Sequence, residues 1–359
     1  MFEFLNTWLA NGSFWVAVPL IIVGCVALIK GADFLVDGAS ALAKKYGVSD
    51  IVIGLTVVAF GTSMPEFVVN MVAVGQGSTE IAITNVLGSN IINIFVILGC
   101  TALIFPISSQ KSTRRFDIPF SLLAALLVLL FAVYNSPSWL QIEHIFNMNI
   151  ADPTLSDLGS IQMGQGNGGF ISGVGGSILL IFFLIFLWHN FKGIGSAPQT
   201  ESNEEYKPMS ARRALALIIG GLVGLVVGGE VIVKSATSIA QSLGVSDAII
   251  GLTVVALGTS LPELATSCMA AFKKNCDIAL GNVIGSNLFN IFFILGTSAC
   301  VKALPGYHGL EIDALMAALG SVLVMLFVYL TKKHEIKRWH GAILLLTYAA
   351  YLTYRIITV

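Results

Sequence analysis

Long apolar segments alternate with short polar segments along almost the whole chain. A helix needs about 20 apolar residues to cross the hydrocarbon core of a bilayer. Segments of about this length predict ten membrane-spanning helices, at 14–36, 51–75, 81–105, 117–134, 171–190, 212–234, 248–272, 278–302, 312–330 and 340–357. The expected fold class is therefore an all-α polytopic membrane protein.

Polar residues are unevenly distributed among these segments. The second, third, seventh and eighth contain several Gly, Ser, Thr and Asn residues, whereas the fourth, fifth, ninth and tenth are rich in Leu, Ile, Val and Phe. The contrast predicts that the first group lines a polar site. Composition supports a membrane location, because 56% of the residues are hydrophobic and only 11% are charged, against about a quarter in soluble domains. No basic run suggests nucleic-acid binding, and no protein partner is predicted.

Lysine and arginine predict the orientation, because cytoplasmic loops carry an excess of both. With both termini outside, the loops on one side hold 15 of the 19 basic residues, and the 191–211 loop is cytoplasmic. These residues are Lys44, Lys45, Lys111, Arg114, Arg115, Lys192, Lys207, Arg212, Arg213, Lys273, Lys274, Lys332, Lys333, Lys337 and Arg338. The expected location is the cell membrane.

The chain contains an internal repeat. Residues 54–66 read GLTVVAFGTSMPE and residues 251–263 read GLTVVALGTSLPE, while NVLGSNIINIFVILG at 85–99 corresponds to NVIGSNLFNIFFILG at 282–296. Each residue has its counterpart 197 positions later. The repeat indicates two related halves.

The halves are expected at 1–190 and 212–359, joined by the 191–211 loop. Each half contains five predicted spans, and because five is odd, equivalent spans must cross the membrane in opposite directions. Such inverted repeats are common in secondary transporters, whose substrate site lies near the midplane.

Glu66 and Glu263 lie about midway along their predicted spans. A carboxylate at this depth is costly and by default marks an ion or proton path. Proline removes a main-chain donor and breaks or kinks a helix, and glycine loosens it. The residues expected to break the two helices are Gly61, Pro65, Gly258 and Pro262.

Oxygen-bearing groups accompany both glutamates. The candidate ligands are Glu66, Glu263, Thr62, Ser63, Thr259, Ser260, Ser89, Ser286, Asn93, Asn290 and the main-chain carbonyls of Ala59 and Ala256, which a broken helix would free. This hard, all-oxygen environment suits Ca²⁺ or Na⁺ and not soft metals. Two buried negative charges need a cation, which is a physical basis for exchanging one ion for others.

Small and amide residues on the third and eighth spans have a supporting role. Gly88 and Gly285 are expected to permit close helix approach, while Asn85 and Asn282 act either as polar contacts between helices or as support for the site. Asp33 and Glu230 are also repeat partners, interpreted as structural or vestibular. Asp33 has Lys30 as a possible i, i+3 partner.

The motifs GTSMPE at 61–66, GSNIIN at 88–93, GTSLPE at 258–263 and GSNLFN at 285–290 resemble those of the cation/Ca²⁺ exchanger superfamily, especially prokaryotic sodium/calcium exchangers. The resemblance covers all ten spans. It implies two inverted five-helix halves, the ligand set given above, and Na⁺/Ca²⁺ exchange by alternating access without a tightly bound cofactor. Some family members have aspartate where this chain has Asn290. The number of Na⁺ per Ca²⁺ and any dependence on K⁺ or H⁺ therefore stay open.

Three other functions are compatible with parts of the sequence. A Ca²⁺/H⁺ antiporter using the same glutamates is the closest alternative. A passive channel would more naturally place its filter on an oligomer axis, and an intramembrane enzyme would need a catalytic motif that the sequence lacks. The first and sixth spans are glycine-rich and are expected to slide against the other eight. The outer loop at 135–170 is expected to be solvated.

Overall fold

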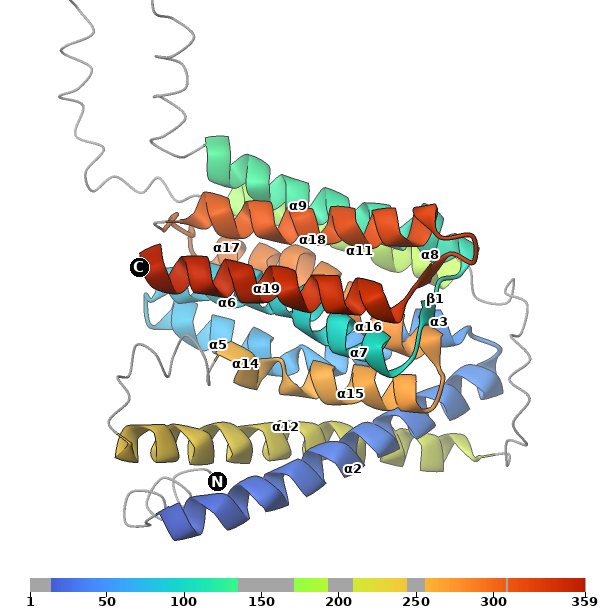
Figure 1. Ribbon diagram of the computed structural model, residues 1–359. Coiled ribbons are helices and arrows are strands. Elements are labelled where there is room, and N and C mark those ends of the chain that lie inside the picture. Colours follow the sequence, from blue (N-terminus) through green and yellow to red (C-terminus); the bar gives the residue numbers. More distant parts are fainter. Residues whose placement is uncertain (1–13, 135–170, 193–208, 244–255, 308, 359) are drawn as a thin grey trace, which may run out of the picture.

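The computed structural model describes most of the chain. The described residues are 14–134, 171–192, 209–243, 256–307 and 309–358. The outer loop, most of the 191–211 loop and the beginning of the seventh predicted span lie outside them. The described residues form a bundle of long helices (Figure 1).

The first half contains five helical segments, three of which are composed of shorter pieces. They are α2 (Phe14–Tyr46); α3 (Asp50–Ile53), η1 (Gly54–Val58), α4 (Ala59–Thr62) and α5 (Met64–Gly75); α6 (Thr79–Ile92), η2 (Asn93–Ile97) and α7 (Leu98–Ile104); α8 (Lys111–Arg115) and α9 (Asp117–Tyr134); and α11 (Gly173–Lys192). The segments labelled η are π-helical.

The second half repeats this order. Its segments are α12 (Ala211–Ser242); α14 (Ala256–Thr259) and α15 (Leu261–Phe272); α16 (Cys276–Leu288), η6 (Phe289–Leu295) and α17 (Gly296–Val301); α18 (Leu310–Leu330); and α19 (Arg338–Thr358). Strands β1 (Ile107–Ser108) and β2 (Glu335–Ile336) form a small antiparallel sheet between the two halves.

The membrane-spanning character of these segments follows from their length and apolarity. Within the described part, seven helical runs are long and apolar enough to cross a bilayer, and the bent pair 50–62 and 64–75 makes an eighth. With the segment that ends in α15 and with α19, the described helices form ten segments in the predicted order. The runs containing α6 and α16 form the centre of the bundle.

Helices α2 and α12 lie side by side and antiparallel along one face of the bundle (Figure 1). A Cβ atom added to Gly31 would lie 2.8 Å from the Gly221 carbonyl oxygen, and one added to Gly221 would lie 2.7 Å from that of Gly31. Only glycine allows such backbone contact. The helices contain 33 and 32 residues, or about 50 Å at 1.5 Å per residue, so the predicted ends at 36 and 234 were too early.

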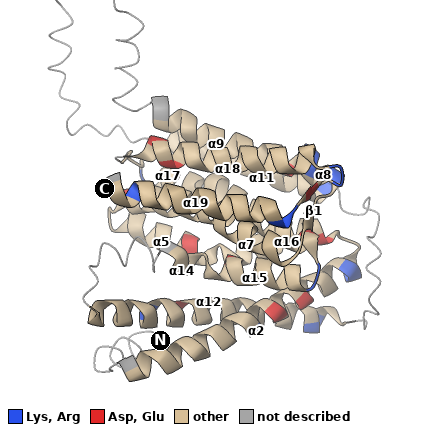
Figure 2. Cartoon of the chain, viewed as in Figure 1, with Lys and Arg blue, Asp and Glu red and all other residues tan. Residues whose placement is uncertain are grey.

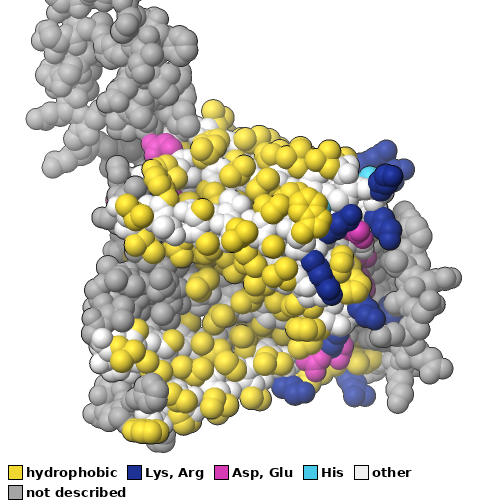
Figure 3. Space-filling view, in the orientation of Figure 1, with side chains coloured by type: hydrophobic (Ala, Val, Ile, Leu, Met, Phe, Trp, Pro, Cys, Tyr) yellow, Lys and Arg dark blue, Asp and Glu magenta, His cyan; other side chains and the backbone are white. Residues whose placement is uncertain are grey.

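The surface has the character expected of a protein in lipid. Hydrophobic side chains cover most of the visible face (Figure 3), and Leu184 and Leu330 are 63% and 78% exposed. Lysine and arginine gather at one end, around the α8 helix, the α15–α16 turn and the connection between α18 and α19 (Figure 2). We call this the basic end. Its contrast with the apolar sides places the bilayer around the middle of the bundle.

Candidate ion-binding site

Two broken helices, one from each half, form the centre of the candidate site. In the first half, the helix breaks at Ser63, between α4 and α5, where the axis bends by 45°. In the second half, the equivalent helix breaks at Ser260, between α14 and α15. The two serines have nearly the same backbone angles, φ −85°, ψ 4° and φ −89°, ψ 4°. Pro65 and Pro262 lie in the first turns of α5 and α15, where a missing main-chain N–H costs little.

Glu66 and Glu263 lie in the first turns of α5 and α15. Both are only 1% exposed, and their carboxyl groups are close enough to interact electrostatically. The Ser63 hydroxyl donates a hydrogen bond to Oε1 of Glu263 over 3.0 Å, which joins the two halves directly. The positive end of each helix dipole favours a negative charge at these positions.

The third and eighth segments bring further oxygens to the same region. Ser89 and Asn93 come from α6 and η2, and Ser286 and Asn290 from α16 and η6, all at most 2% exposed. The Ser286 hydroxyl lies near the Glu263 carboxyl. Both asparagines lie in π-helical turns, a feature that occurs frequently at functional sites and that the sequence pattern did not predict.

Most of these oxygens make no hydrogen bond within the described part of the chain. Twelve buried side-chain polar atoms have no partner there. Eight belong to the predicted site: both carboxyl oxygens of Glu66, Glu263 Oε2, Asn93 Oδ1, Asn290 Oδ1, and the hydroxyls of Thr259, Ser260 and Ser286. Each buried unpaired atom costs about 1–3 kcal/mol. A cation is the ligand that satisfies such oxygens, so the residues present fit Ca²⁺ or Na⁺.

The main-chain ligands differ from the expectation. The Ala59 carbonyl is not freed by the break, because it accepts the Ser63 N–H over 3.0 Å and lies 3.3 Å from the Thr62 hydroxyl. The helical hydrogen bonds of α4 therefore continue as far as the Ser63 N–H, and the bend begins after them. A second lone pair on this oxygen remains available to an ion. Ala256 begins α14, directly after the undescribed residues 244–255.

The amino-acid sequence matches the profile of the sodium/calcium exchanger protein family over residues 16–192 and 213–357. These two ranges contain both broken helices and both glutamates. The chain belongs to this family. It is a transporter rather than an enzyme, and it exchanges Ca²⁺ for other cations across a membrane.

Individual relatives cover the exchanger almost completely. It is 33% identical over 351 residues to the sodium/calcium exchanger MaX1 of Methanosarcina acetivorans, covering 93% of this chain and 96% of that protein. It is 35% identical over 342 residues to the putative antiporter CaxA of Alkalimonas amylolytica, covering 94% and 97%. Its fold matches a structure of the sodium-calcium exchanger NCX_Mj soaked with zero Na⁺ and Ca²⁺, with a TM-score of 0.75, 31% identity and coverage of 95% and 99%.

The supporting amides of the exchanger are used differently in its two halves. Asn282 is fully buried and donates to the Glu263 carbonyl oxygen over 3.2 Å and to the Ser267 hydroxyl over 2.9 Å, while its Oδ1 lies 3.1 Å from the Thr62 hydroxyl. Asn85 is half-buried and donates to Oδ1 of Asn70 over 2.7 Å. Asn282 therefore contacts the broken helices of both halves, at Thr62 and at Glu263, whereas Asn85 contacts the broken helix of its own half, through Asn70 of α5.

Three of the four predicted glycines allow close packing around the breaks. A Cβ atom on Gly61 would lie 2.5 Å from the Leu222 side chain of α12, and one on Gly258 would collide with Val233 of the same helix. A Cβ atom on Gly285 would lie 2.7 Å from the Leu55 carbonyl oxygen. Gly88 is half-buried on α6. Helix α12 therefore rests on both broken helices.

Two residues missed by the sequence analysis are Asn90 and Asn287. They are repeat partners, 1% and 3% exposed, where α6 meets the second half. Each bonds the main chain of the other and the side-chain amide of a predicted ligand. The signal was present, because both stand in the GSN part of the repeated motifs.

A groove of about 520 Å³ lies between α12 and the broken helices. Its lining includes Pro65, Glu230, Lys234, Gly258 and Thr259, so it extends from the C-terminal half of α12 to a predicted ligand. Glu230 forms an ion pair with Lys234 over 3.1 Å. The vestibular position expected for Glu230 matches this groove, which we call the α12 groove.

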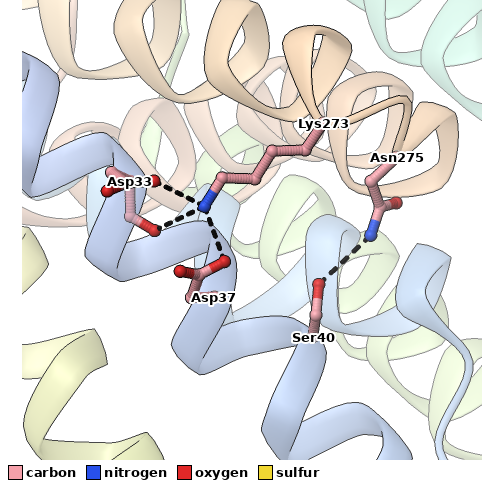
Figure 4. Close-up of polar contacts among 5 residues, drawn as sticks. All are labelled: Asp33, Asp37, Ser40, Lys273 and Asn275. Atoms are coloured by element: carbon pink, nitrogen blue, oxygen red, sulfur yellow. Dashed lines mark hydrogen bonds and ion pairs between the residues drawn. The ribbon is translucent and has the colours of Figure 1, made fainter. Parts of the chain in front are cut away.

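At the basic end, α2 is attached to the turn between α15 and α16 (Figure 4). The Lys273 ammonium lies 2.6 Å from carboxylate oxygens of both Asp33 and Asp37. Asn275 donates to the Ser40 hydroxyl over 3.1 Å. The expected pairing of Asp33 with Lys30 is therefore wrong, because the turn of the second half supplies the partner. We call these contacts the basic-end latch.

Proposed function

We propose that this protein is a secondary active antiporter that exchanges Na⁺ for Ca²⁺ at the site between the two broken helices. The observation that carries the proposal is the set of eight buried oxygens without hydrogen-bond partners, which includes the carboxylates of Glu66 and Glu263. Both halves contribute to this set at repeat-related positions. Family membership supports the same class of cargo.

The chemistry of the site suits both ions. Ca²⁺ takes six to eight oxygens in a flexible shell, and the carboxylates, hydroxyls and amide oxygens supply that number. Two carboxylates compensate one Ca²⁺ completely. Ionised and uncompensated, they would be unstable in a low-dielectric interior. Release of Ca²⁺ therefore favours entry of Na⁺, which couples the two flows.

Alternating access completes the mechanism. Helices α2 and α12 slide over the other eight segments. They move as a pair, because glycines bring their main chains into direct contact. The α12 groove leads from the end opposite the basic end toward Thr259, while the basic-end latch closes the other side. With the basic end cytoplasmic and the termini outside, this arrangement is open toward the exterior of the cell membrane.

Proteoliposomes containing the purified protein test the proposal. Vesicles loaded with Na⁺ and diluted into Na⁺-free buffer should accumulate radioactive Ca²⁺, and vesicles without a Na⁺ gradient should not. A parallel series imposes only a pH gradient. Uptake driven by the pH gradient alone would instead assign the protein to Ca²⁺/H⁺ antiport with the same glutamates. Uptake that needs no counter-ion would indicate a channel.

A further inference from the structure

Asn90 and Asn287 lie beside the predicted ligands, but their side-chain nitrogens and oxygens already make hydrogen bonds to other residues of the protein. Each stands three residues before a predicted ligand, Asn93 or Asn290. All four side chains are at most 3% exposed. Their hydrogen bonds form a closed pattern that relates the two halves by the internal symmetry.

The orientation of Asn90 and Asn287 is fixed by the main chain. The Asn90 amide nitrogen donates to the Asn287 carbonyl oxygen over 3.3 Å, and the Asn287 amide nitrogen donates to the Asn90 carbonyl oxygen over 3.4 Å. A carbonyl oxygen can only accept a hydrogen bond, so each side chain must turn its nitrogen toward it. The two Oδ1 atoms consequently face the other way.

These two oxygens fix the orientation of the ligands in turn. Asn93 donates through Nδ2 to Asn287 Oδ1 over 3.0 Å, and Asn290 donates through Nδ2 to Asn90 Oδ1 over 3.1 Å. Because an amide oxygen only accepts, Asn93 and Asn290 must present their nitrogens here. Their own Oδ1 atoms are buried without a partner in the described part of the chain.

We propose that Asn90 and Asn287 are positioning residues that hold the amides of Asn93 and Asn290 with their oxygens toward the transported ions. This inference rests on the proposed function. Without the acceptor oxygens, each ligand amide could turn over and present NH₂ groups, which repel a cation. Asn287 of the second half orients Asn93 of the first, and Asn90 orients Asn290, so each half sets the ligand geometry of the other.

The test compares leucine variants, which keep the branched shape of the asparagine side chain but make no hydrogen bond. Asn287→Leu should raise the KM for Ca²⁺ by about tenfold or more, with a smaller change in kcat, because outer contacts of metal ligands typically contribute 10–100-fold in affinity. Asn190→Leu is the matched control, since Asn190 is a buried asparagine that bonds α9 and its own helix α11.

A double-mutant cycle separates positioning from a structural role. If Asn287 acts through Asn93, then adding Asn287→Leu to Asn93→Ala should change the KM little further. The rise in melting temperature caused by Ca²⁺ should decrease in the same pattern, which gives a readout independent of transport. Additive effects in both measurements, or a KM as in Asn190→Leu, would overturn the inference.

The outcome also distinguishes this inference from the proposed function. A wild-type protein with neither Na⁺-driven uptake nor Ca²⁺-dependent stabilisation would reject the function itself. A wild-type protein with both, combined with an additive cycle, would reject only the positioning role. If Asn287→Leu does not fold, the same cycle with Asn287→Ala decides.

Discussion

At the scale of single residues, the carboxylates of Glu66 and Glu263 carry the formal charge of the site. Glu66→Gln and Glu263→Gln keep the side-chain size but each remove one negative charge. We expect either variant to abolish Na⁺-driven Ca²⁺ uptake, because a buried divalent ion would then be incompletely compensated. Glu80→Gln is the control, since Glu80 is exposed in the first turn of α6. Near-normal uptake by either site variant would remove that glutamate from the mechanism.

The sequence could predict which polar residues lie buried at the candidate site, but not their hydrogen-bond partners. Oxygen-bearing side chains are conspicuous in apolar segments, so Glu66 and Ser63 stood out in the sequence, and the structure places both in the buried centre of the bundle. Hydrogen bonds are harder, because the acceptor of Ser63 comes from the other half of the chain. Local spacing suggested Lys30 for Asp33, whereas the structure supplies Lys273. Long-range partners leave no trace in the spacing of one segment.

At the scale of helices, close packing around the site depends on glycines. Gly285→Val would bring side-chain atoms within contact distance of the Leu55 carbonyl and of Ala59, whose Cβ lies 2.7 Å from an added Cβ. We expect a loss of stability of about 1–3 kcal/mol from overpacking, seen as a lower melting temperature, together with reduced uptake. Gly220→Val is the control, because Gly220 is exposed and an added Cβ meets no atom within 4 Å among the described residues.

Hydropathy predicted which segments are helices, but it did not predict the π-helical turns inside them or where the longest helices end. It gave all ten spans because burial in lipid selects length and apolarity. The π-helical turns at η2 and η6 were not predicted, since their hydrogen-bond shift has no side-chain pattern. The extension of α2 to Tyr46 was missed because charged residues such as Asp37 end an apolar run without ending a helix.

Among the described residues, the ion pairs of the basic-end latch have no counterpart at the repeat-related positions of the other half. The repeat counterpart of Lys273 is the uncharged Gln76. Lys273→Met should therefore weaken closure at the basic end. The KM for Ca²⁺ supplied from the basic end should decrease relative to the KM for Ca²⁺ supplied from the opposite end. The expected change in the ratio is about two- to thirtyfold, because the two partly exposed ion pairs of Lys273 contribute about 0.2–1 kcal/mol each. Vesicles of both orientations give the two KM values, with Lys45→Met as control. An unchanged ratio would contradict a role of the latch in access.

At the scale of the whole molecule, inverted symmetry explains how one sequence motif serves both sides of the membrane. Exchanging the conformations of the two halves would convert an arrangement open at one end into one open at the other. The halves need not be equally stable in both arrangements. They differ at the basic end, where the basic-end latch joins α2 to the α15–α16 turn, and also at the site, where Ser63 bonds Glu263 but Ser260 has no hydrogen-bond partner among the described residues. We expect these differences to decide which of the two arrangements is preferred.

Locking the sliding pair tests this view of the molecule. Ser40→Cys with Asn275→Cys places two thiols where a hydrogen bond of 3.1 Å joins α2 to the α15–α16 turn. Oxidation should stop exchange, and reduction should restore it, since α2 can no longer move over the bundle. The matched lock is Ser177→Cys, which faces Cys300 at 3.7 Å within the bundle and should leave exchange intact. In each protein, every native cysteine that does not belong to the intended disulfide is replaced. Full exchange by the oxidised Ser40–Asn275 pair would mean that α2 stays fixed during transport, whereas loss of exchange in both locked proteins would mean that the bundle itself deforms.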